Sequence, residues 1–152
     1  MIWRVVHWVG RLGLGALFLY AGYTKLRSPF LFEMAVDGYQ LLPAGAVIVV
    51  ARVLPWLEVV LGLWLLAGWK LRYSATFMAS LLGFFVVVMG VTYARGIEAD
   101  CGCFGLGEPI TPATLTRDSL LFVLAVFLAI YAWRREAAGS TAAPPLPERS
   151  VS

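Results

Sequence analysis

Four long runs of apolar residues constrain the fold of this chain more than any other feature. They lie at about residues 5–23, 44–69, 73–93 and 114–133. Each run approaches or exceeds the roughly 20 helical residues needed to cross the hydrocarbon layer of a bilayer. A chain inside a bilayer must satisfy its own backbone hydrogen bonds, so such runs form helices. The sequence therefore predicts an all-α membrane protein, a bundle of four transmembrane helices.

The composition agrees with this fold class and argues against binding to nucleic acid. Apolar residues make up 61% of the chain and charged residues only 14%, whereas soluble domains carry about 25% charged residues. The net charge is +3, but the basic residues stand at the ends of the apolar runs, where snorkelling and topology explain them. We therefore expect the chain to contact a lipid bilayer and no nucleic acid.

The chain divides into a membrane domain and a tail. Residues 1–135 contain the four spans, and residues 136–152 are rich in Ala, Gly, Ser and Pro, a composition typical of a disordered cytoplasmic tail. No convincing small-x-small cleavage site precedes Lys25, so we expect the first helix to be retained. Residues 27–43 mix polar and apolar side chains and predict a short amphipathic helix at the bilayer surface.

The distribution of basic residues predicts the orientation of the bundle, because cytoplasmic loops carry more Lys and Arg. One side of the membrane collects Arg4, Arg11, Lys70, Arg72, Arg134 and Arg135, and the other collects Lys25, Arg27, Arg95 and Arg117. We expect a multi-pass protein of the inner (cytoplasmic) membrane with both termini in the cytoplasm. The loop at residues 95–110 then lies outside the cytoplasm, where disulfides persist.

The most specific local feature is Cys101 and Cys103, which are separated only by Gly102. A disulfide needs Cα atoms within about 7 Å of each other, and the glycine supplies backbone freedom. Closing so small a loop stabilises a fold little, and strain makes a disulfide easier to reduce, as in catalytic pairs. Glycines on both sides of Phe104 would keep the loop open to a partner. The sequence favours a redox pair and leaves open a passive disulfide.

A metal site at the two cysteines is the weakest interpretation of the sequence. Zinc takes four ligands, and the only histidine, His7, stands at the opposite membrane face. The thiolates of Cys101 and Cys103 are suited to Cu(I), but we identify no further ligand in the chain. The sequence therefore assigns no metal.

Arg52 and Glu58 place two charges inside the second run, where charges are costly and usually paired or functional. Six residues separate them by about 9 Å along a helix and about 120° around it, so they cannot form the ordinary i,i+4 pair, although a kink at Pro55 would bring them closer. We expect each to meet polar groups on other helices. The candidate partners are Tyr20, Thr24, Ser80 and Thr92. A polar clamp in the bundle is favoured over a proton relay or a quinone-binding group.

Two further basic residues flank the spans on the cysteine side. Lys25 and the neighbouring tyrosines are typical of interface anchors. Arg117 and Asp118 are expected in the first turn of the fourth helix, where Asp118 suits the positive helix end. Arg117 either contacts the cysteine loop and favours a thiolate or contacts a lipid headgroup.

Taken together, these motifs resemble the MauE family, which is related to the wider DoxX-like membrane proteins. The elements are Gly22-x-x-Lys25-Leu26, Pro55-x-x-Glu58 with Gly62, Asp100-Cys-Gly-Cys-Phe-Gly105, and Arg117 at the start of the fourth helix. The resemblance covers about residues 8–133. It implies a four-helix bundle with a cysteine pair at its outer end. It also implies a role in maturing a disulfide-containing client, which for named members is the methylamine dehydrogenase small subunit, together with a thioredoxin-like partner.

The resemblance thus favours extracytoplasmic thiol–disulfide exchange, with a membrane quinone as a candidate cofactor. Cys101 and Cys103 would be the redox pair, and the supporting residues would be Glu58, Arg52, Lys25 and Arg117. Whether the chain is itself an oxidoreductase stays open, because membrane enzymes of similar layout, such as vitamin K epoxide reductase, use a second cysteine pair. The alternatives are a non-catalytic scaffold with a structural disulfide and a DoxX-like carrier built on Arg52 and Glu58.

Overall fold

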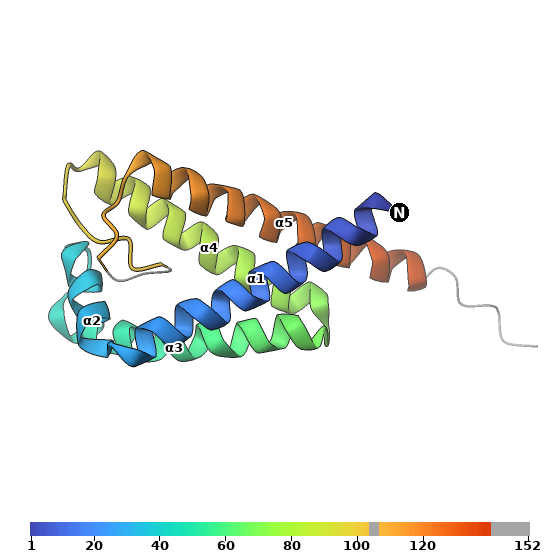
Figure 1. Cartoon of the computed structure of the whole chain (residues 1–152), viewed down its shortest axis with the longest axis horizontal. Helices are drawn as coiled ribbons and strands as arrows, with labels where there is room; N and C mark the ends of the chain where they lie inside the picture. The colour runs from blue at the N-terminus through green and yellow to red at the C-terminus, as the bar shows by residue number, and fades with distance from the viewer. Residues whose placement is uncertain (104–106, 141–152) are drawn as a thin grey trace, which may run out of the picture.

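The computed structural model of the chain describes residues 1–103 and 107–140 and is helical almost throughout (Figure 1). Its helices are α1 (Ile2–Arg27), α2 (Pro29–Gly38), α3 (Ala44–Ala67), α4 (Leu71–Ala94) and α5 (Pro112–Ser140). Four of them, α1, α3, α4 and α5, are long and apolar enough to cross a membrane. The predicted all-α, four-span membrane protein is therefore confirmed.

The four spans alternate in direction and form two closely packed pairs. Helix α1 packs mainly on α3, and α4 packs mainly on α5. The α1–α3 contact is close because glycines face it: a Cβ added to Gly22 would lie 2.8 Å from the Pro55 carbonyl oxygen. All four spans contribute to the buried core, which includes Leu14, Phe18, Leu61, Leu65, Met78, Leu82, Leu128 and Ala129.

Helix α2 covers one end of the bundle, next to the loop that joins α4 to α5 (Figure 1). It begins with Pro29 in the first turn after Ser28, a position where proline costs no hydrogen bond. Phe32 and Val36 are buried together with Val47 and Ala51 of α3. The α4–α5 loop and α2 thus close the end of the bundle that lies away from the N-terminus.

Helix α5 is longer than the apolar run that predicted it. It continues to Ser140, past residue 136, where the sequence placed the start of a disordered tail. Glu136 lies in this extension and forms an ion pair with Arg72 of α4 at 2.7 Å, and the alanines that follow favour helix. The rest of the predicted tail, residues 141–152, lies outside the described residues.

Candidate functional site

A short ribbon in the α4–α5 loop positions the cysteines. Asp100 and Pro109 form an isolated antiparallel bridge, and the Cys101 N–H donates to the Glu108 carbonyl at 2.6 Å. The Ile110 N–H donates to the Ala99 carbonyl at 3.0 Å on the other side of this bridge. The ribbon therefore fixes the backbone of Cys101. Phe104 and Gly105, which we expected to help keep the loop open, lie outside the described residues.

Both cysteines are buried free thiols. Cys101 is 1% exposed and Cys103 is 7% exposed. Their sulfurs meet Met89 of α4, with Sγ–Sδ distances of 3.4 Å for Cys101 and 3.8 Å for Cys103. The expectation that the pair is open to a partner is therefore wrong for this conformation, because α2, α4 and α5 enclose the sulfurs. No disulfide joins the two sulfurs in this structure.

The residue between the cysteines explains how both sulfurs reach the same pocket. Gly102 has a φ of +64°, in the left-handed region that side chains other than glycine avoid. A Cβ at this position would lie 3.5 Å from Phe32 and Ala35 of α2. The Tyr39 hydroxyl, just after α2, donates to the Cys101 carbonyl at 2.6 Å. The left-handed conformation of Gly102 and these contacts hold the cysteine segment against α2.

A buried ion pair ties the same segment to the spans. The Lys25 ammonium of α1 lies 2.6 Å and 2.8 Å from the two carboxylate oxygens of Glu58 of α3, and it donates to the Cys103 carbonyl at 2.8 Å. Lys25 is 1% exposed and Glu58 is 4% exposed. The three donor positions of the ammonium are therefore all used, which is what a buried charge requires.

This pair corrects two sequence predictions. Lys25 is no interface anchor, and Glu58 meets none of the four partners that we expected for it. The reason is tertiary: Gly22 and Gly62 let α1 and α3 approach closely, so a lysine near the end of one span reaches a glutamate within another. Arg52 also differs from expectation. It is exposed on the outside of α3, so the structure does not bring it to the site of Glu58.

Arg117 and Asp118 of α5 approach the cysteines from the other side. Arg117 donates to Asp118 at 3.1 Å and to Glu108 at 3.0 Å, and a third guanidinium nitrogen lies 3.8 Å from Cys101 Sγ. Asp118 is 2% exposed, and its second oxygen lies 3.6 Å from the same sulfur. Because α5 begins at Pro112, these residues stand in its second turn, not in the first as predicted. Sequence analysis missed the contact of Asp118 with the cysteine.

The two thiols differ in acidity. The hydrogen bond that the Cys103 side chain offers to Cys101 lowers the pKa of Cys101, with smaller help from the Cys103 backbone and Arg117, while burial and Asp118 oppose the change. The same hydrogen bond and burial raise the pKa of Cys103. Cys101 is therefore the more acidic thiol of the pair, and a lower thiol pKa favours the nucleophilic thiolate.

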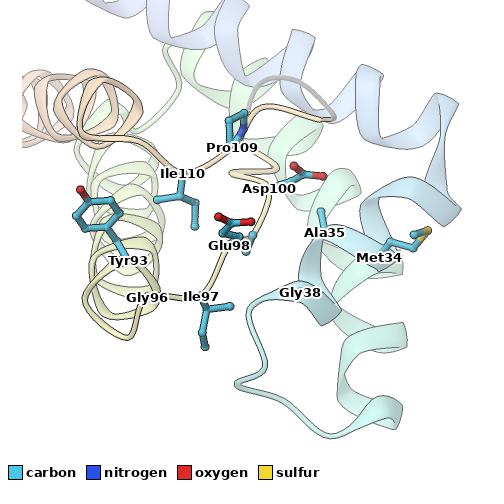
Figure 2. Close-up of a pocket in the computed structure, with 11 residues that line it drawn as sticks. Met34, Ala35, Gly38, Tyr93, Gly96, Ile97, Glu98, Asp100, Pro109 and Ile110 are labelled. Carbon is cyan, nitrogen blue, oxygen red and sulfur yellow. The ribbon is translucent and has the colours of Figure 1, made fainter.

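An open hollow of about 720 Å³ lies between α2 and the cysteine loop (Figure 2). Its lining includes Met34 and Gly38 of α2, Tyr93 of α4, and Glu98 and Asp100 of the loop. Asp100 immediately precedes Cys101, and the two acidic side chains lie on the loop side of the hollow (Figure 2). The hollow gives a partner segment a place to contact the loop beside the buried pair.

Comparison with known proteins gives one family. The family described as methylamine utilisation protein MauE matches residues 4–132. The chain is 33% identical over 132 residues to the methylamine utilization protein MauE of Paracoccus denitrificans, covering 85% of this chain and 71% of that protein. It is 34% identical over 125 residues to the same-named protein of Paracoccus versutus, covering 80% and 67%. For the one from Methylophilus methylotrophus, identity is 33% over 105 residues, covering 68% and 53%. No solved structure matches the chain significantly.

Proposed function

Since this chain belongs to the MauE family, we propose that it supports thiol–disulfide exchange outside the cytoplasm, with Cys101 and Cys103 as its redox pair. The process served would be the maturation of a disulfide-containing client protein, in methylamine utilisation as the names of its relatives indicate. The observation that carries this proposal is the pair itself. Two adjacent thiols of unequal acidity lie next to the loop residues that line an open hollow at one end of a membrane bundle.

The electrons of the proposed exchange pass between the Cys101–Cys103 pair and a disulfide of the partner. The Cys101 thiolate attacks a partner disulfide, so one partner thiolate leaves and a mixed disulfide forms. Cys103 then loses its proton and attacks Cys101 Sγ, which closes the Cys101–Cys103 disulfide and releases the second partner thiolate. Two electrons pass to the partner. In the opposite direction, a client dithiol is oxidised and the pair becomes reduced.

The burial of the pair gives the surrounding residues a supporting role. Neither sulfur can be attacked until the loop moves away from α2, and the hydrogen bonds from Lys25 and Tyr39 to the cysteine carbonyls oppose this movement. Arg117 lies near the sulfur that bears negative charge in the exchange. Lys25, Glu58 and Arg117 therefore act as positioning residues, whereas exposed Arg52 has no such place in the mechanism.

The proposed setting follows from the charge distribution. Both termini would lie in the cytoplasm and the loop would face outward from the inner membrane, where a thioredoxin-like partner can reach it. When a client dithiol has reduced the pair, the two-electron oxidant needed to restore the Cys101–Cys103 disulfide would be supplied by a membrane quinone. The side on which the loop lies and the oxidation state of its cysteines can be tested with a membrane-impermeant thiol reagent on intact cells, with and without reductant.

Trapping of a mixed disulfide tests the exchange directly. In Cys103→Ala the resolving thiol is gone, so Cys101 should accumulate a reductant-sensitive adduct with a thioredoxin-like protein on non-reducing gels. Cys101→Ala should trap less, because its remaining thiol is the less acidic one. The double alanine variant, which contains no cysteine, is the control. The proposal is wrong if neither single variant yields an adduct in cells that contain the partner.

A scaffold role is the second candidate, and the close packing of both thiols against Met89 favours it. In that case replacing both cysteines by serine would leave client maturation largely intact. The carrier alternative receives less support, because Arg52 is exposed and Glu58 is engaged by Lys25. It would require Glu58→Gln to abolish function while the cysteine variants remain active.

A further inference from the structure

Three sulfur atoms, two from the α4–α5 loop and one from α4, converge inside the protein. Met89 Sδ lies 3.4 Å from Cys101 Sγ and 3.8 Å from Cys103 Sγ, and the two cysteine sulfurs lie within 4.8 Å of each other. Met89 is fully buried at 0% exposure. We propose that these three sulfurs form a three-coordinate binding site for Cu(I), a role that goes beyond thiol exchange.

The ligand types select the metal. Thiolate and thioether sulfur together favour Cu(I). Zinc takes four Cys, His or carboxylate ligands in a tetrahedral site. Among the described residues, Cys101, Cys103 and Asp118 offer only three such groups within 4.8 Å of one another, and a methionine thioether is not among the usual zinc ligands. Iron–sulfur clusters are usually held by four cysteine thiolates, and the chain has two cysteines. A Cys–Cys–Met set therefore points to Cu(I) among the common metals.

The spacing of the sulfurs fits a trigonal site. With a metal–sulfur distance of about 2.3 Å, the value for zinc thiolates, three sulfurs around a central ion lie about 4 Å apart. The two distances to Met89, 3.4 Å and 3.8 Å, are shorter than this spacing by about 0.6 Å and 0.2 Å. Met89 has an unbranched side chain that adapts to small shifts. The left-handed Gly102 holds both cysteine sulfurs on the same side of the loop.

The surroundings also suit the charge of such a site. Two thiolates and one Cu(I) carry a net charge of −1, and the Arg117 guanidinium lies 3.8 Å from Cys101 Sγ. Asp118 adds a negative charge nearby, but Arg117 donates a hydrogen bond to it. Lys25 donates to the Cys103 carbonyl from the opposite side. Glu58 balances the charge of Lys25, so Arg117 is the cation that offsets the burial of the anionic cluster.

Copper titration of the reduced, full-length protein in detergent tests the site. Under anaerobic conditions and in competition with a chromophoric Cu(I) chelator, the wild type should bind one Cu(I) per chain. X-ray absorption should show three sulfurs at about 2.3 Å, taking the thiolate value as a guide. Fewer than one Cu(I) per chain, or a coordination shell with only two sulfurs, would overturn the proposal. Tighter binding of Zn(II) than of Cu(I) would also overturn it.

Met89→Leu isolates the new ligand, because this substitution nearly conserves volume and leaves both cysteines in place. It should weaken Cu(I) binding by at least about tenfold, the lower range seen when even outer-shell partners are lost, and remove one sulfur from the spectrum. Met78→Leu is the matched control, since Met78 is also buried at 0% exposure on α4 but lies in the bundle core. Equal affinity of Met89→Leu and wild type would refute the site. Trapping by Cys103→Ala in the Met89→Leu background tests thiol exchange separately.

Discussion

The two ends of the bundle differ in how deeply their charged side chains are buried and in how these side chains are paired. At the loop end, Lys25, Glu58 and Asp118 are each less than 5% exposed, and each has a charged partner. At the opposite end, Arg72 and Glu136 form a partly exposed pair, and the buried His7 Nε2 has no hydrogen-bond partner within the described part of the chain. Within the described residues, the buried charged groups that have charged partners thus gather around the cysteines, which indicates that the loop end is built for precise placement of these thiols.

The ion pairs at the two ends offer the largest contrast. Lys25→Met leaves Glu58 buried without its cation, and breaking a buried pair in this way costs about 3–5 kcal/mol. Arg72→Met at the other end should cost at most about 1 kcal/mol, because that pair is partly exposed. Thermal unfolding in detergent measures both. A similar loss of stability in the two variants would remove the distinction between the ends.

The same two variants also distinguish the ends of the bundle when the rate of cysteine labelling is measured. Lys25→Met also removes the donor to the Cys103 carbonyl, so maleimide should label the cysteines faster than in wild type. Arg72→Met should leave the labelling rate unchanged. The double variant Lys25→Met with Glu58→Leu should recover part of the stability, since removing both charges is less costly than removing one.

Alanine variants at two glycines of the loop distinguish the effect of backbone strain from the effect of displacing the thiols. Gly102 and Gly96 both have positive φ values, +64° and +70°. Alanine at either position should cost about 1–2 kcal/mol, because side chains disfavour this region. Only Gly102 contacts α2, so only Gly102→Ala should also slow disulfide formation between the cysteines under a mild oxidant. Equal oxidation rates in the two variants would show that the loop tolerates displacement of the pair.

Single hydrogen bonds provide a smaller test. Tyr39→Phe removes the donor to the Cys101 carbonyl and should cost about 1 kcal/mol, the usual net contribution of such a bond. The His7 ring packs on Tyr131 with 4.8 Å between the ring centroids. His7→Phe should leave the free energy of unfolding almost unchanged, because phenylalanine preserves this packing and eliminates the unpaired nitrogen. Chemical unfolding of the two variants side by side gives the difference, and a larger loss for His7→Phe would contradict it.

The sequence predicted the helices and the cysteine pair for one reason: both are local patterns. Apolar runs specify spans by length, and a Cys-Gly-Cys segment can be recognised directly in the sequence. The residues that contact the cysteines and the charged groups come from other helices, and no local pattern identifies them. Lys25 stands near the end of a span, where a lysine ordinarily anchors at the interface, and only the close α1–α3 contact at Gly22 and Gly62 turns it inward. Met89 is one apolar residue among many in its run, so nothing in the sequence distinguished it as a neighbour of the sulfurs.

The acidity of the two thiols gives the last test and the smallest effect. The pKa of Cys101 lies below the ordinary thiol value of 9.0, chiefly because Cys103 donates to it, whereas the pKa of Cys103 is raised. In reduced protein, the rate of alkylation by iodoacetamide at Cys101 should therefore level off at lower pH than that of an ordinary thiol. Peptide mass spectrometry assigns each site. In Cys103→Ala the Cys101 profile should move to higher pH, because its hydrogen-bond donor is gone. An unchanged profile would mean that the two cysteines do not interact, which would undermine a shared role in exchange.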